Sequence, residues 1–319
     1  VPLRTLANQF KTRADAWLER LGLSMEASIQ TGEHPTDPKL EGDLIFATID
    51  QLLSSALMRP YSLSSSQANL NLGSVVGSYL VLDEAHLFDW GSTLPTSLVL
   101  LKMLKGVCPF VVMTATLSGE MQEQLALFLS AQVVSVTEPS RESGGGLPSA
   151  QRTRMLSWRD ELMSADAVIQ HHRSRSLVVC NTVERAMNLY RDLQTRLQGE
   201  DVRLVLLHSR FRQADRARKE RELVELFGRE ADRRTGSAIA VATQVVEVGL
   251  DISCETLHTE LAPASSLVQR AGRCARYAGE VGEVYVYNVD SPSPYQEQAA
   301  LVDLTREAMP AYSGRDLSL

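Results

Sequence analysis

The stretch "YLVLDEAHLFDW", from Tyr79 to Trp90, joins an apolar, β-prone run to a group of ionisable side chains. Asp83, Glu84 and His86 come at the end of that run. Burying carboxylates at the end of a strand costs free energy unless another group compensates their charge, and a bound cation is the usual one. The stretch therefore predicts a buried strand that ends at a cation site, although the two acids could instead cap a following helix.

Short apolar runs like this one recur along the chain and alternate with longer amphipathic stretches. Strands are expected at 43–48, 78–83, 109–114, 133–136, 176–181, 203–208, 238–243, 256–261 and 283–288. Helices are expected near 5–21, 48–58, 120–130, 183–198, 213–228 and 296–308. Continuous apolar runs suit strands that are buried on both faces, so the alternation predicts an α/β fold with parallel sheets flanked by helices.

A segment rich in Gly, Ser and Pro divides the chain into two halves with the same rhythm. Its sequence, "EPSRESGGGLPSAQRT" (138–153), has the composition of a linker. We therefore expect one domain over 1–137, a second over 154–290 and a helical segment over 291–319. Ligands of open α/β sheets bind at the carboxyl ends of the strands, so function is expected in a cleft between the halves. Two independent domains are the alternative.

The composition is that of a globular protein without a membrane-spanning segment. The 319 residues are 44 % hydrophobic, and no apolar run approaches the roughly 20 residues of a membrane span. The net charge of −7 does not indicate a polyanion partner, but all except five of the basic residues are arginine, which suits phosphate contacts. Four widely spaced cysteines indicate reduced thiols in a cytoplasmic protein.

Asp83 and Glu84 are expected to serve different atoms of a nucleotide reaction. A carboxylate after a parallel strand is where nucleotide-hydrolysing folds hold Mg²⁺, so Asp83 is the candidate metal ligand. Glu84 could then act as the general base on the attacking water. Thr114 and Thr116 follow the next expected strand and could hydrogen-bond His86, although hydroxyl residues at strand ends are more often turn or cap residues.

An arginine-rich stretch, "LVQRAGRCAR" (267–276), is the second candidate for phosphate chemistry. If 265–276 form a helix, Gln269, Arg273 and Arg276 lie on one face of it. Arginines that point into a cleft stabilise the charge on a transferred phosphoryl group. A solvated basic helix is the alternative interpretation.

The segment "ATQVVEVGLDIS" (242–253) precedes this arginine cluster. An expected strand ends at Thr243, and Gly249 and Asp251 lie in an expected turn. Acidic side chains accept hydrogen bonds from ribose hydroxyls in nucleotide sites, so Asp251 is a candidate ribose ligand.

Taken in order, these segments resemble the motifs of the superfamily 2 helicases. "VLDEAH" is similar to motif II in its DEAH form, "TAT" (114–116) to motif III, "ATQVVEVGLDIS" to motif V and "QRAGRCAR" to motif VI. "VPLRTLANQ" (1–9) resembles motif Ia, "TG" (31–32) motif Ib, "ATIDQLL" (47–53) motif Ic and "VVCNTVERA" (178–186) motif IV. The resemblance implies two tandem RecA-like domains that use ATP and Mg²⁺.

Within that superfamily, three segments resemble the CRISPR-associated helicase-nuclease of type I interference. They are "LLHSRFRQADRARKE" (206–220), "NTVERA" (181–186) and "APASSLVQRAGRCAR" (262–276). The resemblance covers about residues 1–290. It implies an ATP-driven translocase on single-stranded DNA, which an RNA-guided surveillance complex recruits and which works with a metal-dependent HD nuclease in cis or in trans.

The resemblance also implies roles for individual residues. Asp83 would bind Mg²⁺, Glu84 would activate water, Arg273 and Arg276 would reach the γ-phosphate, and Gln269 would couple to the motif II acids. His86, Thr114 and Thr116 would relay hydrolysis to the nucleic-acid groove. Candidate strand-binding positions are Arg4, Thr31, Gly32, Thr48, Asn181, Thr182, His208, Ser209, Arg210 and Thr243.

Two features of the family pattern do not occur in this sequence. No lysine follows a glycine, so the phosphate loop G-x-x-x-x-G-K-[ST] is missing, and no histidine is followed by the aspartate of an HD nuclease. We therefore expect a fragment of a larger enzyme, with the first RecA-like domain truncated at its N-terminus and little ATPase activity of its own. The alternatives are a general DNA or RNA helicase unrelated to CRISPR and a non-hydrolysing nucleic-acid-binding scaffold.

Overall fold

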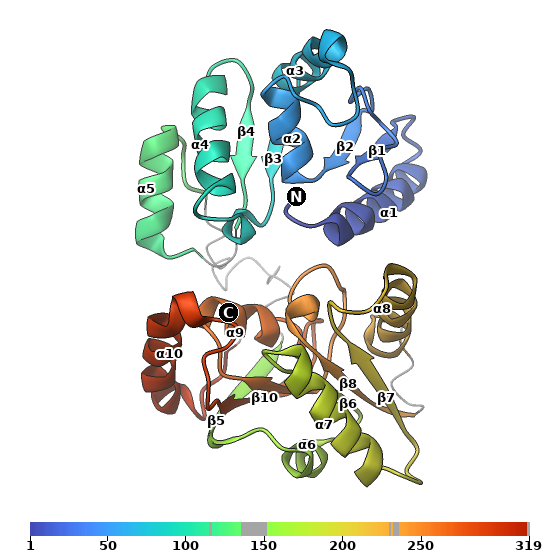
Figure 1. The fold of residues 1–319 in the computed structure, drawn as a ribbon, viewed down its shortest axis with the longest axis vertical. Helices are drawn as coiled ribbons and strands as arrows, with labels where there is room; N and C mark the ends of the chain where they lie inside the picture. The colour runs from blue at the N-terminus through green and yellow to red at the C-terminus, as the bar shows by residue number, and fades with distance from the viewer. Residues whose placement is uncertain (115–116, 135–151, 230, 232–235, 318–319) are drawn as a thin grey trace, which may run out of the picture. The chain divides into compact units, whose positions relative to one another are not determined.

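The chain forms two compact units, Val1–Val136 (unit 1) and Thr137–Leu319 (unit 2), in a computed structural model (Figure 1). The structure describes residues 1–114, 117–134, 152–229, 231 and 236–317. Most of the predicted linker, 138–153, and Thr116 lie outside these residues. Each unit has its own sheets and its own hydrophobic core.

Unit 1 contains two separate parallel sheets of two strands each. One sheet pairs β1 (Ala27–Gln30) with β2 (Leu44–Ala47), and the other pairs β3 (Leu80–Leu82) with β4 (Phe110–Val112). The helices are α1 (Arg4–Leu21), α2 (Ile49–Ala56), α3 (Ala68–Val76), α4 (Thr93–Leu104) and α5 (Gly119–Leu129), with short 3-10 turns η1 (Ser65–Gln67) and η2 (Ala85–Leu87).

Unit 2 is built on one six-stranded parallel sheet in the order β5-β10-β9-β6-β8-β7. Its strands are β5 (Thr153–Leu162), β6 (Arg175–Val179), β7 (Val202–Leu207), β8 (Ser237–Ala242), β9 (Thr256–Glu260) and β10 (Val281–Asn288). Its helices are α6 (Ala165–His171), α7 (Val183–Arg196), α8 (Gln213–Phe227), α9 (Ala264–Ala271) and α10 (Ala299–Tyr312), with 3-10 turns η4 (Gln244–Val246) and η5 (Gln296–Gln298).

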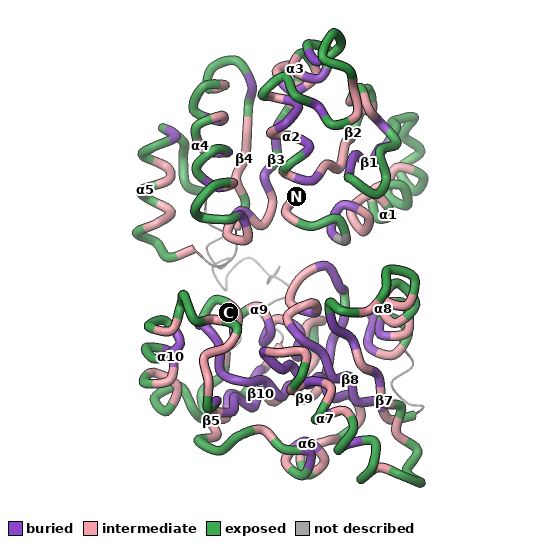
Figure 2. The backbone as a smooth tube through the Cα atoms, viewed as in Figure 1, coloured by how far each residue is buried: buried purple, intermediate pink, exposed green. Residues whose placement is uncertain are grey.

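The sheet of unit 2 is covered on both faces, because alternate residues of its strands enter two different cores. Leu177 and Val179 of β6 pack with Phe227 of α8, whereas Val178 of the same strand packs with Leu193 of α7. The central strands β6, β8 and β9 are almost wholly buried (Figure 2). This arrangement confirms the predicted α/β fold with parallel strands between helices.

The core of unit 1 lies around the second of its sheets. Leu80 and Leu82 of β3 pack with Phe88, Leu94 and Leu101. The strand β2, in contrast, is exposed or half-buried along its whole length (Figure 2). The two units thus differ in how completely their strands are covered.

Most predicted strands and helices occur within a few residues of their expected positions, but some predictions were wrong. Residues 133–134 form no strand, and the helix expected over 265–276 ends at Ala271. The strands β1 and β5 and the helices α3, α4 and α6 were not predicted. The sequences of β1, "ASIQ", and of β5, "TRMLSWRDEL", lack a continuous apolar run, which explains why they were missed. No helix in the described residues is long and apolar enough to cross a membrane.

Candidate functional site

The turn after β3 holds the two adjacent carboxylates at the carboxyl end of that strand. Glu84 has left-handed backbone angles, φ 52° and ψ 43°, and its N–H donates to Asp83 Oδ1 at 2.9 Å. The neighbouring strand β4 fixes the turn, because Met113 N donates to Leu82 O at 2.8 Å and Ala85 N donates to Met113 O at 3.1 Å. Both carboxylates therefore start from a defined backbone, as expected for groups that must meet a ligand at set positions.

His86 connects this turn to the end of β4. Its Nδ1 lies 3.1 Å from Thr114 Oγ1 and 3.5 Å from Glu84 Oε2. The His86 side chain is 8 % exposed, and this burial lowers the pKa of the imidazole, although Asp83 acts in the opposite direction. The structure therefore confirms the predicted contact of Thr114 with His86, and it adds Glu84, whose contact with His86 was not predicted. The other predicted coupling residue, Thr116, lies outside the described residues.

Asp83 can be tested as a ligand of a Mg²⁺ ion that takes only one carboxylate from the protein. Mg²⁺ at nucleotide sites usually keeps several waters and takes one or two carboxylates together with phosphate oxygens. No cluster of three or more His, Cys, Asp or Glu side chains that could hold a metal occurs in the described part of the chain. A preformed protein cage for a metal is thus not found there, and a Mg²⁺ ion at Asp83 would take its other ligands from phosphate oxygens and water.

The predicted strand-binding residues of unit 1 divide into contacts at the surface and buried groups. Arg4, at the start of α1, pairs with Glu33 at 2.9 Å, and its guanidinium lies so near Gly32 that a Cβ there would be 3.1 Å from Nη2. Thr31 is 1 % exposed, and its hydroxyl accepts from His34 N at 3.1 Å. Arg4 and Gly32 therefore form one surface, and Thr31 shapes the turn beside it.

Thr48 lies at the carboxyl end of β2 and is 4 % exposed. Its N–H donates to Gln30 O at 3.3 Å. Its hydroxyl is buried and has no hydrogen-bond partner among the described residues. A buried hydroxyl in this state is costly, so Thr48 retains a donor that a ligand could use.

In unit 2, Arg270 is the centre of a network at the carboxyl ends of the strands. Its side chain is completely buried, and Nε donates to Glu247 Oε1 at 2.8 Å. Nη1 donates to Asn181 Oδ1 at 3.0 Å and to Thr259 Oγ1 at 2.8 Å, and Nη2 donates to Tyr295 OH at 2.9 Å. A single guanidinium thus ties together four segments that are distant in sequence.

This network accounts for Asn181, which was predicted to contact a nucleic acid. Asn181 is 2 % exposed, its Oδ1 accepts from Arg270, and its Nδ2 donates to Leu261 O at 2.7 Å. Its main-chain N–H donates to Glu260 Oε2 at 2.6 Å. We correct the prediction: both polar atoms of the Asn181 side chain serve the fold, and none is directed to a ligand. Thr243 is likewise buried, 2 % exposed, at the end of β8.

Three other predicted strand-binding positions follow β7, and one of them, His208, is buried with 6 % of its surface exposed. Ser209 and Arg210 are exposed, and Arg210 N donates to His208 Nδ1 at 3.2 Å. His208 stacks on Phe211 with ring centroids 4.1 Å apart, and burial lowers the pKa of its imidazole. Stacking holds the turn in place and leaves Arg210 outward. Thr182 caps α7, since its hydroxyl accepts from Arg185 N at 3.3 Å.

The prediction that Gln269, Arg273 and Arg276 share one face of a helix was wrong. The helix α9 ends at Ala271, so Arg273 and Arg276 lie beyond it and not on one helical face with Gln269. Arg273 is 8 % exposed and donates to the main-chain oxygens of Leu250 and Glu247, both at 2.5 Å. Gly272, after Ala271, ends the helix, and the Arg273 guanidinium instead holds the preceding loop.

Arg276 was predicted to reach the γ-phosphate and Asp251 to bind a ribose, and the structure pairs these two residues with each other. Its Nε donates to Asp251 Oδ1 at 2.7 Å, and Tyr277 OH donates to Asp251 O at 3.2 Å. The loop can turn here because Gly249 has φ 86°, a value that favours glycine. Asp251 and Arg276 therefore form one partly exposed pair.

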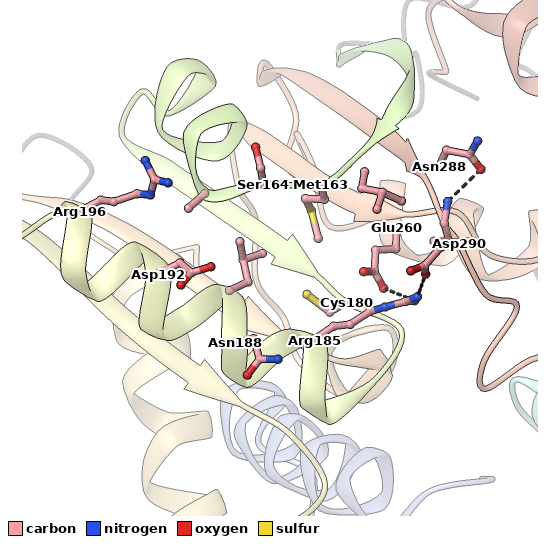
Figure 3. A pocket seen from close by; sticks show the side chains of 14 residues that line it. Met163, Ser164, Cys180, Arg185, Asn188, Asp192, Arg196, Glu260, Asn288 and Asp290 are labelled. Atoms are coloured by element: carbon pink, nitrogen blue, oxygen red, sulfur yellow. Dashed lines mark hydrogen bonds and ion pairs between the residues drawn. The ribbon is translucent and has the colours of Figure 1, made fainter.

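A pocket of about 300 Å³ lies beside the Arg270 network, at the carboxyl ends of β5, β6, β9 and β10 (Figure 3). Arg185 extends between two acids in it, 3.5 Å from Glu260 Oε2 and in contact with Asp290 (Figure 3). Burial raises the pKa of the Glu260 carboxyl. The hydrogen bond from Asn181 and the charges of Arg185 and Arg270 oppose this rise. The acids balance the arginine, so this pocket carries no excess of positive charge for a phosphate.

Sequence reasoning missed Glu247 as part of the site. Its side chain is 10 % exposed and pairs with Arg270, and burial raises the pKa of its carboxyl although Arg270 opposes this. Glu247 is a charged residue inside the apolar run "VVEVGL", and that position was the signal that could have identified it. A charge inside a buried run is expected to have a partner.

Family models of helicases match residues in both units. A model of the family "DEAD/DEAH box helicase" matches residues 1–125, and one of "CRISPR-associated nuclease/helicase Cas3, C-terminal" matches residues 172–279. The "CRISPR-associated helicase Cas3" of Thermoproteus tenax is 26 % identical over 324 residues, which are 97 % of this chain and 52 % of the relative. This chain thus spans about half the length of that relative.

Solved structures are similar in fold. The "Crystal structure of T. fusca Cas3-ATP" matches with a TM-score of 0.72 and 24 % identity over 99 % of this chain and 44 % of that chain. A chain of the "CRISPR RNA-guided surveillance complex, pre-nicking" matches with a TM-score of 0.72 and 21 % identity over 100 % of this chain and 42 % of that chain. At these identities the similarity shows the fold, which is that of paired RecA-like domains.

Proposed function

Because this chain belongs to the helicase portion of the CRISPR-associated Cas3 family, we propose that it drives single-stranded DNA translocation by hydrolysing ATP during type I CRISPR interference. The observation that carries the proposal is the contact of Glu84 and Thr114 with His86 at the end of β3. Through His86, this contact connects Glu84, the acid proposed to activate water, with Thr114 at the end of β4. A motor needs such a connection to pass hydrolysis on to its nucleic-acid surface.

Asp83 and Glu84 divide the chemistry between them in this proposal. Asp83 binds Mg²⁺, which supplies charge neutralisation at the phosphates when it is bound. Glu84 orients the attacking water and accepts its proton. A neutral His86, whose pKa burial lowers, holds the Glu84 carboxylate without adding a proton to it.

Residues of unit 2 complete the nucleotide chemistry in the same proposal. Arg276 and Arg273 contact the γ-phosphate, Asp251 accepts from the ribose, and Gln269 couples to the acids. Arg273 can do so only after its guanidinium leaves the main-chain oxygens of Leu250 and Glu247. We therefore assign the phosphate contact first to Arg276, whose side chain is 37 % exposed.

The single strand is proposed to run over Arg4, Gly32, Thr48, Thr182, Ser209 and Arg210. Arg4 and Arg210 supply charge for the phosphates, and the others supply neutral donors, which suits contacts that do not depend on base sequence. The proposed partners are an RNA-guided surveillance complex of type I CRISPR systems and an HD nuclease in cis or in trans. The names of the solved complex and of the curated relatives support these two partners.

The test compares Glu84→Gln with wild type in the full-length enzyme. The amide keeps the shape of the side chain but cannot accept a proton, so DNA-stimulated ATP turnover should fall by about 10²–10⁴-fold while ATP and DNA affinities stay within about twofold. Arg210→Ala is the matched control at the nucleic-acid surface: it should weaken DNA binding and leave basal turnover unchanged. A loss of turnover below about tenfold in Glu84→Gln would remove Glu84 as the base.

A further inference from the structure

The loop after α9 carries Arg273 and Arg276, and its backbone is unusual at Ala275. Ala275 has a left-handed φ of 44° and is completely buried. A residue with a Cβ keeps this conformation only where the surrounding structure holds it. The hydrogen-bond partners of the loop 273–276 therefore decide the positions from which its two arginine side chains start.

One side of the loop is held by the segment that precedes β9. Cys254 N donates to Arg273 O at 2.9 Å, and Ala275 N donates to Cys254 O at 2.9 Å. Arg276 N donates to Ser253 Oγ at 2.9 Å. These bonds leave the carbonyl oxygens of residues 274–276 to other partners.

Those carbonyl oxygens accept from two arginines at the start of β5. Arg154 Nε donates to Cys274 O at 2.6 Å, and Arg154 Nη2 donates more weakly to Ala275 O at 3.5 Å. Arg152, two residues earlier, donates from Nη1 to Arg276 O at 2.9 Å. Arginine suits this task because its planar guanidinium presents several N–H groups in a fixed fork, which can meet successive carbonyl oxygens.

Arg154 is buried, although β5 lies at the edge of its sheet. It is 6 % exposed, and the partners of its guanidinium are main-chain oxygens and not carboxylates. Burial lowers the pKa of this guanidinium, and the charges of Arg152 and Arg276 lower it further, although Asp316 opposes them. Burying a charge near like charges costs free energy, and the bonds to the loop compensate part of this cost.

The backbone of Arg154 is fixed on both of its sides. Arg154 pairs with Gly282 in the parallel ladder of β5 with β10. On the other side its N–H donates to Asp316 Oδ1 at 2.9 Å, and its carbonyl oxygen accepts from Leu317 N at 2.8 Å. The guanidinium therefore extends from a defined position, which a residue that supports a functional loop needs.

We propose that Arg154 is a positioning residue for ATP hydrolysis. By holding the carbonyl oxygens of Cys274 and Ala275, it keeps the loop in the conformation from which Arg276 reaches the γ-phosphate, and Arg152 adds a third bond to the same loop. This inference rests on the proposed function, because it takes Arg276 as the residue that contacts the phosphate. Both supporting arginines lie outside the segments that resemble helicase motifs.

The expected defect of an Arg154 variant is in the rate of hydrolysis and not in ATP binding. Arg276 remains present in such a variant, but its side chain starts from a displaced backbone. An arginine finger acts mainly on the charge of the transition state. A displacement of about 1 Å can slow a reaction by about 10²-fold. The kcat should therefore fall, whereas the KM for ATP should stay near its wild-type value.

The test compares Arg154→Lys with wild type in the full-length enzyme. Lysine keeps the charge but cannot donate from a planar fork. The DNA-stimulated kcat should fall by about tenfold to 10²-fold, and the KM for ATP should stay within about twofold. The affinity for ADP with aluminium fluoride, which mimics the transferred phosphoryl group, should fall by about the same factor as kcat. Arg159→Lys is the matched control, because Arg159 lies on the same strand over the Tyr285 ring, and it should keep both constants.

A double-mutant cycle separates positioning from a general effect on the fold. In the background of Arg276→Ala, Arg154→Lys should slow hydrolysis by less than about twofold, because no Arg276 guanidinium is left to position. A similar loss in both backgrounds would overturn the proposal and make Arg154 a residue that only supports the fold. The fraction of Arg154→Lys that binds a non-hydrolysable ATP analogue should equal that of wild type. A smaller fraction with an unchanged rate per bound site would also overturn the proposal.

The same variants distinguish failure of this inference from failure of the proposed function. If Arg276→Ala hydrolyses ATP as fast as wild type, Arg276 does not contact the phosphate, and both assignments are wrong. If Arg276→Ala is slow while Arg154→Lys has the wild-type kcat, only the role of Arg154 is wrong, since a lysine cannot hold both carbonyl oxygens.

Discussion

At the scale of single residues, Glu84 combines a strained backbone with the carboxylate proposed for catalysis. Its φ of 52° is uncommon for a residue with a Cβ and is most easily adopted by glycine. Such strain persists only where the surrounding structure holds it, here through the bonds of Ala85 and Met113 to the neighbouring strand.

The backbone and the carboxylate of Glu84 can be separated by substitution. Glu84→Gly should leave the free energy of unfolding of unit 1 within about 1 kcal/mol of wild type, because relief of strain offsets the greater entropy of the unfolded chain. Denaturant unfolding of the isolated chain measures this. A loss above about 2 kcal/mol would mean that the side chain supports the turn.

Arg270 is expected to stabilise unit 2 through its buried ion pair with Glu247. Arg270→Ala should lower the free energy of unfolding of unit 2 by about 3–5 kcal/mol, because it leaves the buried Glu247 without its partner. The matched control is Arg276→Ala, which breaks the partly exposed pair with Asp251 and should cost at most about 1 kcal/mol. Equal losses in a urea titration would contradict a structural role specific to Arg270.

His258 makes unit 2 sensitive to acid. Burial lowers the pKa of its imidazole from 6.5 to about 3, and Nε2 has no hydrogen-bond partner among the described residues. The unfolded chain therefore binds a proton more readily than the folded chain between these values. Stability is fully present above pH 6.5 and should fall by up to about 1.4 kcal/mol per pH unit as the pH drops toward 3.

The measurement compares wild type with His258→Leu from pH 7 to pH 4. The variant should lose less stability over this range, while His171 and His172, whose pKa values burial also lowers, keep part of the dependence. Parallel curves for the two proteins would assign the acid sensitivity to other groups.

At the scale of elements, β10 lies so close to the loop after α9 that one methyl group cannot be added. A Cβ on Gly282 would be 2.3 Å from Cys274 Sγ and 3.1 Å from Glu255 O. Gly282→Ala should therefore destabilise unit 2 by about 1–3 kcal/mol. Adding Cys274→Ala should recover part of this loss in a double-mutant cycle by thermal denaturation. Strictly additive losses would place the clash elsewhere.

The sequence predicts elements best where the apolar run is continuous. Leu177–Val179 and Ile239–Val241 read as buried strands and are buried strands. The strand β5 carries Arg159, Asp160 and Glu161 because it lies at the edge of its sheet, where charged side chains reach water. The end of α9 depends on Gly272 and on the bonds of Arg273 to a loop that is distant in sequence, which local periodicity does not contain.

At the scale of the whole molecule, the two units should differ in how well each folds when it is expressed alone. Unit 2 has one six-stranded sheet with a core on each face, whereas the described strands of unit 1 form two separate pairs. Residues 152–319 expressed alone should therefore unfold cooperatively, with a midpoint within about 2 °C of the transition of unit 2 in the whole chain. A broad transition for 152–319 would show that unit 2 needs the rest of the chain.

The sequence predicts which residues lie near one another in the site better than it predicts which of their polar atoms are already hydrogen-bonded within the fold. The motifs predicted the contact of His86 with Thr114, but not the ion pair of Asp251 with Arg276, which were expected to meet a ribose and the γ-phosphate. Spacing could not show that the Asn181 side chain bonds inside the fold, because its partners Leu261 and Arg270 lie 80 and 89 residues later in the sequence. Burial and hydrogen bonding depend on the sheet order, which no single motif encodes.

The close approach of Cys274 to Gly282 has a practical consequence for following unit 2 in solution. The Cys274 side chain is buried, and its sulfur lies where a Cβ on Gly282 would be. A thiol reagent can reach this sulfur only when the loop after α9 separates from β10. The rate at which Cys274 is labelled in the native protein therefore measures the opening of this edge, without any denaturant.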